Sequence, residues 1–164
     1  MSLRSRSFAP VVRPDTRILI LGSLPGQRSL AEGQYYAHPR NRFWHLVGRV
    51  TEIDFPALDY PARLDALLAH GIGLWDAVQS ARRKGSLDAD MRDVEATDLP
   101  ELVNRLPRLR AVAFNGKASE RIGRPQLSGM DVHCLALPSS SPAHAAMNFD
   151  QKAAVWDTLR QFLR

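Results

Sequence analysis

Short apolar runs alternate with amphipathic stretches along this chain and set its predicted architecture. Residues 17–23 (RILILGS) and 111–116 (AVAFNG) are continuous apolar runs that end at glycine or serine, and residues 132–144 (VHCLALPSSSPAH) begin as a third run before a Ser/Pro loop. Such runs are typical of strands that are buried on both faces of a parallel sheet. Residues 71–78 (GIGLWDAV) predict a further short strand or an extended lead into a loop.

The stretches between these runs have the spacing of amphipathic helices. The clearest is PARLDALLAH at residues 61–70, which has proline at its start and glycine directly after it. Further helices are predicted at residues 43–51, 97–106, 117–122 and 150–163. Strands that alternate with helices predict an α/β fold with a mainly parallel sheet. Residues 80–93 (SARRKGSLDADMRD) are predicted to form a charged connector, and residues 1–15 a loosely packed N-terminal arm with some pairing.

The composition of the chain indicates which classes of molecule it could bind. The 164 residues suit one domain, and 22 Lys and Arg against 17 Asp and Glu give a formal net charge of +5. A basic balance favours a polyanionic partner, although a high arginine content is also what a GC-rich genome produces. The single cysteine, Cys134, excludes a disulfide within the chain and a four-cysteine cluster.

Other features of the sequence exclude further classes. The start of the chain lacks an apolar core of signal-peptide length, and no apolar run approaches the length needed to cross a membrane, so we expect a cytoplasmic protein without a membrane partner. His38, His45, His70 and His133 do not have the spacing of metal ligands, so we expect no metal site.

Distinctive residues follow the predicted strands, where the carboxyl ends of a parallel sheet form a ligand site. The three segments are GSLPG at 22–26, FNG at 114–116 and LPSSSPAH at 137–144. Between the first two lies YYAHPRNRFW at 35–44, in which arginines can hold phosphates and aromatic rings can stack on a base. This collection predicts a site that grips a nucleic acid and holds one base out of the helix. The alternative is that Asn41 only caps a helix and that Phe43 and Trp44 only anchor it in the core.

Taken together, GSLPG (22–26), QYYAHPRNRFW (34–44), GSLD (85–88) and LPSSSPA (137–143) resemble the uracil-DNA glycosylase superfamily. They are most similar to its hypoxanthine-DNA (deoxyinosine) glycosylase branch. The resemblance implies a three-layer α/β/α sandwich with a central four-stranded sheet, in one glycosylase domain spanning residues 1–164. It also implies an enzyme that flips a deaminated base out of DNA and hydrolyses its N-glycosidic bond. Because water is the nucleophile and the motifs contain no lysine, we expect a monofunctional glycosylase, and we expect a monomer that needs no cofactor.

The resemblance also suggests which residues carry the chemistry. Leu24 stands where many members have Asn or Asp, and leucine cannot polarise water, so Asn41 is the predicted main catalytic residue and Asn115 the second. The predicted base pocket consists of Gly22, Ser23, Leu24, Pro25, Gly26, Tyr36 and Phe43. For Asn115 a structural turn, and for Tyr36 loop packing, remain open alternatives.

Phosphate contacts are predicted from the late loop and from nearby cations. The DNA-binding candidates are Arg40, Ser139, Ser140, Ser141, Pro142 and His144, and Ser29 and Asp88 are supporting candidates. Arg42, Arg82, Arg83 and Lys84 are further phosphate candidates. The alternatives are an ordinary Ser/Pro loop, a helix cap at Asp88 and solvated surface charge. Leu137 stands where some relatives have a histidine, so no catalytic histidine is assigned.

Three other functions compete with excision of hypoxanthine. One is a glycosylase for uracil or for G/U mismatches on the same fold, because pocket size decides between these bases. A second is a nucleic-acid-binding module without catalysis, which the leucine in the first motif favours. A third is an enzyme acting on nucleotides, against which the absence of a Walker or dinucleotide glycine pattern argues.

Overall fold

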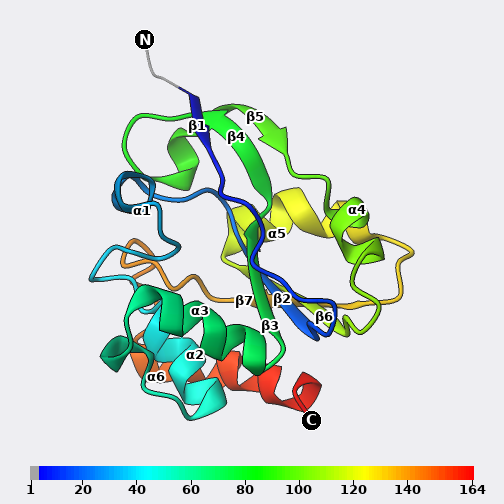
Figure 1. Ribbon diagram of the computed structural model, residues 1–164. Helices are drawn as coiled ribbons and strands as arrows, with labels where there is room; N and C mark the ends of the chain where they lie inside the picture. Colours follow the sequence, from blue (N-terminus) through cyan, green and yellow to red (C-terminus); the bar gives the residue numbers. More distant parts are fainter. Residues whose placement is uncertain (1–3) are drawn as a thin grey trace.

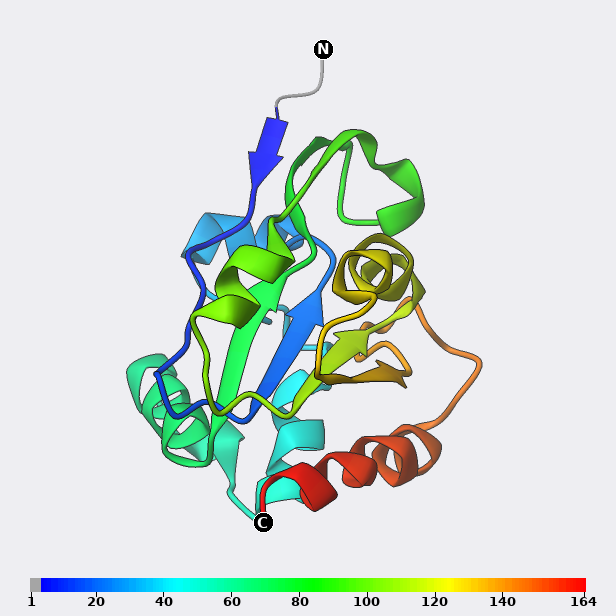
Figure 2. The same cartoon turned by 90° about the vertical axis from the view of Figure 1, so that its right-hand side faces the viewer.

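A four-stranded parallel sheet forms the centre of the protein. The computed structural model describes residues 4–164, so the first three residues of the predicted N-terminal arm lie outside the described part. In the order β3-β2-β6-β7, the strands are β3 (Ile72–Asp76), β2 (Ile18–Gly22), β6 (Ala111–Asn115) and β7 (His133–Leu137). All neighbouring pairs are parallel, so all four carboxyl ends lie at one edge (Figure 2).

Helices cover both faces of this sheet because its strands are apolar on both sides. Ile18 and Ile20 pack with α2 (Phe43–Thr51), α3 (Tyr60–Ala69) and α6 (Phe149–Trp156). Leu19 and Leu21 face the other way and pack with α4 (Leu99–Asn104) and η3 (Arg124–Leu127). The helix α5 (Lys117–Gly123) contacts β6. Figure 1 shows α2, α3 and α6 on one side of the sheet and α4 and α5 on the other, which confirms the predicted three-layer sandwich.

A second, smaller sheet replaces much of the predicted charged connector. It is antiparallel, in the order β1 (Arg4–Arg6), β4 (Val78–Arg82), β5 (Arg92–Ala96). The prediction of a connector over residues 80–93 was therefore wrong at both ends. All five residues of β5 are exposed, and only Val94 and Ala96 in it are apolar, so its sequence gives little sign of a strand. Between β4 and β5 lies an exposed loop that contains the short 3-10 helix η2 (Asp88–Asp90).

The other departures from the predicted elements are local. The helix α1 (Gln27–Glu32) occupies a segment for which no helix was predicted, and its only buried residue is Ser29. The closing helix ends at Trp156 and continues as the 3-10 segment η4 (Asp157–Phe162) instead of running unbroken. Another 3-10 turn, η1 (Phe55–Ala57), precedes α3. Ahead of β2, Val11 pairs with Leu74 of β3 through two backbone hydrogen bonds of 2.9 Å. None of the helices in the described residues is both long and apolar enough to cross a membrane.

Candidate active site

Two loops from distant parts of the chain meet at the carboxyl ends of the central strands. The backbone N–H of Arg42, just before α2, donates to the carbonyl of Ser140 at 3.0 Å. Ser140 is in turn held by Asn115, the last residue of β6. Figure 1 shows the loop after β7 passing beside the segment that leads into α2. The structure thus brings the predicted residues Asn41, Asn115 and Ser140 to one place.

Asn41 holds the start of α2 and keeps a hydrogen-bond donor free. Its Oδ1 accepts the backbone N–H of Phe43 at 3.0 Å, and its own N–H donates to the carbonyl of His38. The residue directly before the helix is Arg42, so Asn41 acts one position earlier than the predicted cap. Within residues 4–164 the Nδ2 group of this half-buried side chain donates no hydrogen bond. A neutral amide donor is therefore available beside the strand ends.

Asn115, in contrast, has its carboxamide fully engaged. The side chain is 8% exposed, and its Oδ1 accepts the N–H of Ser140 at 2.9 Å. Its Nδ2 donates to Ser140 Oγ at 2.9 Å and to the Tyr36 hydroxyl at 3.3 Å. These three bonds join β6 to the loop after β7 and to the tyrosine segment. Little of the hydrogen-bonding capacity of Asn115 remains for a base.

Tyr36 covers the predicted stacking residue. Its ring lies parallel to Phe43, with centroids 3.9 Å apart and an interplanar angle of 13°. Phe43 is completely buried, and Trp44 and Trp156 approach it edge-on. A base can therefore reach the face of Phe43 only where Tyr36 moves aside. Tyr36 has a φ of 54°, a left-handed conformation that is strained for a bulky residue.

The residues of the glycine motif, 22–26, have two different surroundings: some lie at the site and others pack in a separate apolar cluster. Gly22 lies at the site, since a side chain there would meet Asp76 and Tyr36. Leu24 instead belongs to an apolar cluster with Val78, Ala81, Met91 and Ala118, so the leucine contributes to the packing of β4 and α5. Pro25 offers its carbonyl to the buried guanidinium of Arg83.

A polar latch joins the glycine motif to the predicted GSLD element. The hydroxyl of Ser23 donates to Asp88 Oδ1 at 2.6 Å, and the N–H of Gln27, next to Gly26, donates to Ser86 Oγ at 3.0 Å. Ser29 of α1 holds the tyrosine segment, because its Oγ accepts the N–H of Ala37 at 3.0 Å. Both predicted supporting residues thus fix loops around the site.

The loop after β7 is held by its own hydroxyls as well as by Asn115 and by α6. Ser139 Oγ accepts the N–H of Ser141 at 3.1 Å, and Ser141 Oγ accepts the N–H of Ala143 at 3.2 Å. Lys152 of α6 donates to the carbonyl of Ser141 at 3.3 Å. Pro142 is exposed, and the Nε2 atom of His144 is buried without a partner in the described residues.

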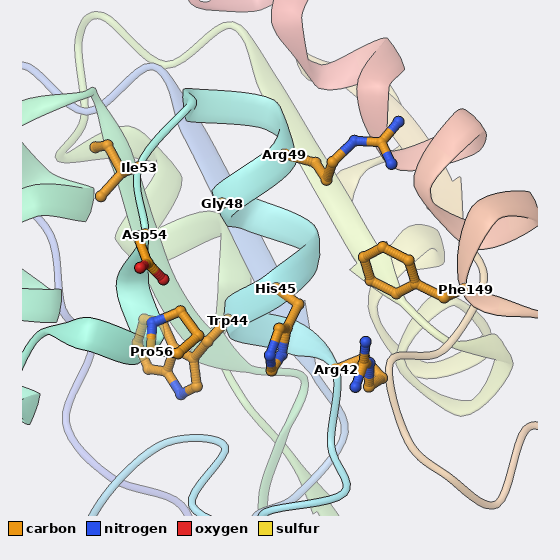
Figure 3. Close-up of a pocket in the computed structure, with 9 residues that line it drawn as sticks. All are labelled: Arg42, Trp44, His45, Gly48, Arg49, Ile53, Asp54, Pro56 and Phe149. Carbon is orange, nitrogen blue, oxygen red and sulfur yellow. The ribbon is translucent and has the colours of Figure 1, made fainter.

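The predicted phosphate-binding cations have different surroundings. Arg40 is exposed, whereas Arg42 lies over the ring of Phe149 at 4.8 Å. Arg82 pairs with Asp93 at 3.7 Å, and Arg83 is only 4% exposed, so Arg83 does not offer a surface contact. Arg42 also borders a surface hollow of about 300 Å³ along α2, which Figure 3 shows together with His45, Arg49 and Phe149. Among residues 4–164, no group of three His, Cys, Asp or Glu side chains is arranged to hold a metal ion.

Asp76 is a site residue that the sequence analysis missed. It ends β3 beside Gly22, is 3% exposed, and accepts the hydroxyl of Ser7 at 2.6 Å. Burial raises the pKa of this carboxyl to about 7; the bond from Ser7 and the charge of Arg83 oppose the rise, and Asp88 adds to it. The signal in the sequence was an acidic residue at the end of the apolar run GIGLWD, directly at a strand end.

Comparison with known proteins agrees with this geometry. Residues 9–160 match the sequence profile of the family described as the uracil DNA glycosylase superfamily. The chain belongs to this superfamily. The match confirms the resemblance inferred from the four motifs. It extends over almost all of the described residues.

Individual members of the superfamily are similar over nearly their full length. A protein named hypoxanthine DNA glycosylase from Methanosarcina barkeri is 40% identical over 142 residues, which is 87% of this chain and 89% of that protein. One of the same name from Methanosarcina acetivorans is 36% identical over 154 residues, or 94% and 96% of the two chains. A solution NMR structure of a proposed uracil DNA glycosylase from M. acetivorans has a TM-score of 0.88 at 34% identity, covering 99% of this chain and 100% of that one.

Proposed function

We propose that this protein is a monofunctional DNA glycosylase that hydrolyses the N-glycosidic bond of deoxyinosine and releases hypoxanthine. The observation that carries the proposal is the free amide donor of Asn41, fixed by the N–H of Phe43 next to the strand ends. The two similar proteins named hypoxanthine DNA glycosylase support the choice of base. The predicted substrate is DNA that contains the deaminated base.

In this mechanism Asn41 stabilises the departing base. As the bond from C1′ to N9 breaks, its electron pair passes to the purine, and negative charge develops on the ring nitrogens and on O6. The Nδ2 of Asn41 donates to one of these acceptors, while water adds to the cationic sugar. Because Oδ1 is bound to the N–H of Phe43, the carboxamide is held in one orientation with its donor side free. An asparagine amide is not a base near neutral pH, so the developing sugar cation, stabilised by the DNA phosphates, supports the attack of water.

The loop of Ser139, Ser140 and Ser141 and the side chain of Arg40 are the proposed contacts to the DNA backbone. Both lie near Asn41, because Arg40 directly precedes it in the chain and the N–H of the following Arg42 donates to the carbonyl of Ser140. Asn115 takes a positioning role in this proposal, because its three hydrogen bonds keep the loop of the three serines in place.

The proposed function is tested with purified protein and duplexes that each hold one deoxyinosine, deoxyuridine or deoxyxanthosine. We expect abasic sites in the deoxyinosine duplex, seen as strand breaks after hot alkali and absent without it. Breaks that appear without alkali would contradict a monofunctional mechanism. Release of uracil alone would favour the second candidate, a uracil glycosylase, which the similarity to the proposed uracil DNA glycosylase of M. acetivorans supports. DNA binding without release of any base would point to a module without catalysis.

Binding to DNA should weaken with salt in proportion to the number of phosphates contacted. Replacing Arg40 by alanine should make the slope of log affinity against log salt shallower by about 1 unit, because one phosphate contact is lost. Fluorescence anisotropy with a labelled duplex, at several salt concentrations, measures this slope. Arg105→Ala is the matched control, since Arg105 is an exposed arginine that pairs with Glu101 on α4, in the opposite layer. Equal slopes for the two variants would remove Arg40 from the DNA interface.

A further inference from the structure

Lys152 is a buried cation for which the described residues supply no counter-ion. Its side chain lies on α6 and is only 5% exposed, although lysine is almost never buried unless it is paired. None of the ion pairs within residues 4–164 includes Lys152. Its Nζ donates one hydrogen bond in this part of the chain, to the carbonyl of Ser141 at 3.3 Å. Burial lowers the pKa of the ammonium, because an unpaired charge is destabilised away from water, so an anion that reaches Nζ is bound favourably.

The loop that Lys152 binds has hydroxyl groups whose hydrogens are unused. Ser139 Oγ and Ser141 Oγ each accept a backbone N–H of the same loop, from Ser141 and from Ala143. Neither hydroxyl donates to another group within residues 4–164, so each keeps its O–H free for an acceptor. Hydroxyl donors beside a buried ammonium form a site that suits an oxyanion with several acceptor atoms, such as a phosphate.

A second cation approaches the same loop from α2. The backbone N–H of Arg42 donates to the carbonyl of Ser140, and its guanidinium lies over the ring of Phe149 at 4.8 Å. Phe149 stands three residues before Lys152 on α6, and Figure 3 shows it beside Arg42. Because residues three apart are neighbours on a helix, positive charge from α2 and from α6 gathers around the serine loop. This charge favours a phosphodiester over a neutral ligand.

We propose that Lys152 is a phosphate-binding residue, whose ammonium neutralises the DNA phosphate that the hydroxyls of Ser139 and Ser141 hold. The proposal rests on the glycosylase function and deepens it, because it assigns the charged contact that a loop of neutral serines lacks. Two of the three N–H donors of Nζ are unused within residues 4–164, so Lys152 can bind a phosphate oxygen and keep the carbonyl of Ser141. The contact is the same in the bound substrate and in the transition state, so it contributes to affinity and not to the rate of bond cleavage.

The test compares Lys152→Met, which keeps an unbranched side chain of similar length without its charge, with Arg108→Met. Arg108 is an exposed cation just before β6, at the edge of the sheet opposite the site, so each variant loses one positive charge. Binding is measured by fluorescence anisotropy, at several salt concentrations, with a duplex that holds a tetrahydrofuran abasic analogue, which a glycosylase cannot hydrolyse. Lys152→Met should bind about tenfold more weakly at about 0.1 M salt, and its slope of log affinity against log salt should be shallower by about 1 unit. Arg108→Met should leave both the affinity and the slope unchanged.

Thermal unfolding of the free protein distinguishes a phosphate contact from a structural anchor of the loop. Replacing a buried, unpaired ammonium by an apolar side chain of similar size should raise Tm by about 2–4 °C. If Lys152 serves only to anchor the loop through the carbonyl of Ser141, Lys152→Met will lower Tm and weaken binding at an unchanged salt slope, and the proposal fails. Ser141→Ala shows what the loss of a neutral contact looks like, namely weaker binding at an unchanged slope.

Single-turnover release separates this proposal from the function on which it rests. With enzyme at saturating excess, Lys152→Met should release hypoxanthine within a few-fold of the normal rate, because it has lost only uniform binding. A loss of about 10²-fold at saturation would assign Lys152 to the chemical step and overturn the proposal. If the unmodified protein releases no base from any duplex, yet the salt slopes differ between the unmodified protein and Lys152→Met as expected, the proposed function fails and the phosphate contact of Lys152 stands.

Discussion

Replacing Asn41 by alanine should lower the single-turnover rate of base release by about 10²–10³-fold while leaving the protein folded. The expected loss follows from the position of its Nδ2, which has no partner in the described residues and lies where α2 meets the strand ends. Removing this donor withdraws stabilisation that is needed only when the base leaves with the electron pair. The rate of release from a deoxyinosine duplex under excess enzyme measures the effect directly.

The same substitution also removes the acceptor for the N–H of Phe43, which should cost about 1 kcal/mol of stability. Asn41→Asp separates the two effects. Its carboxylate still accepts the N–H of Phe43, at the positive end of the α2 dipole, so the thermal stability should equal or exceed that of the unmodified protein. It has no donor, and its charge repels the departing base, so release should be at least as slow as in Asn41→Ala. Full activity in Asn41→Asp would show that the carbonyl side of Asn41, acting on water, carries the chemistry.

The central sheet could be predicted because the burial of its strands on both faces requires continuous apolar runs in the sequence. Every residue of β2 and β6 is buried, and a short, continuous apolar run that ends at a turn residue is typical of a strand covered on both faces. The small sheet could not be predicted, because β5 is exposed along its whole length and looks like a polar connector. The helix α1 escaped notice for a similar reason, since it buries one serine and begins after Gly26 without a side-chain cap.

The sequence predicted that Asn41, Asn115 and Ser140 lie together, but not which of their groups are already hydrogen-bonded. An asparagine looks alike in sequence whether its NH2 group is free or hydrogen-bonded. Only the folded loops show that Nδ2 of Asn115 is hydrogen-bonded, whereas Nδ2 of Asn41 has no partner within residues 4–164. The ring of Tyr36 covers Phe43 because the backbone of Tyr36 is left-handed, and the pattern of polar and apolar residues does not predict that conformation. Asp76 became visible only when parallel pairing placed the end of β3 against Gly22. The sequence motifs thus predict which residues gather at the strand ends, and the tertiary contacts show which of their polar groups remain free for a ligand.

The largest effect on stability is expected at Asn115, because its carboxamide joins three parts of the site. Asn115→Ala should lower the free energy of unfolding by about 2–4 kcal/mol, since it leaves the buried N–H of Ser140 without an acceptor and opens a small cavity. For a chain of this size such a loss lowers Tm by roughly 10 °C. Chemical or thermal unfolding followed by circular dichroism gives the value.

Ser140→Ala provides the graded comparison for this prediction. It removes only the hydroxyl that accepts from Asn115 Nδ2 and keeps the bond from the Ser140 N–H to Oδ1, so its cost should be about 1 kcal/mol. If Asn115 acts by positioning the serine loop, both variants should weaken DNA binding, and Asn115→Ala should weaken it more than Ser140→Ala. Once substrate is bound, both variants should still convert it within about tenfold of the normal rate. A stable Asn115→Ala protein that binds DNA normally yet has lost about 10²-fold in rate would instead make Asn115 a catalytic residue, as the sequence first suggested.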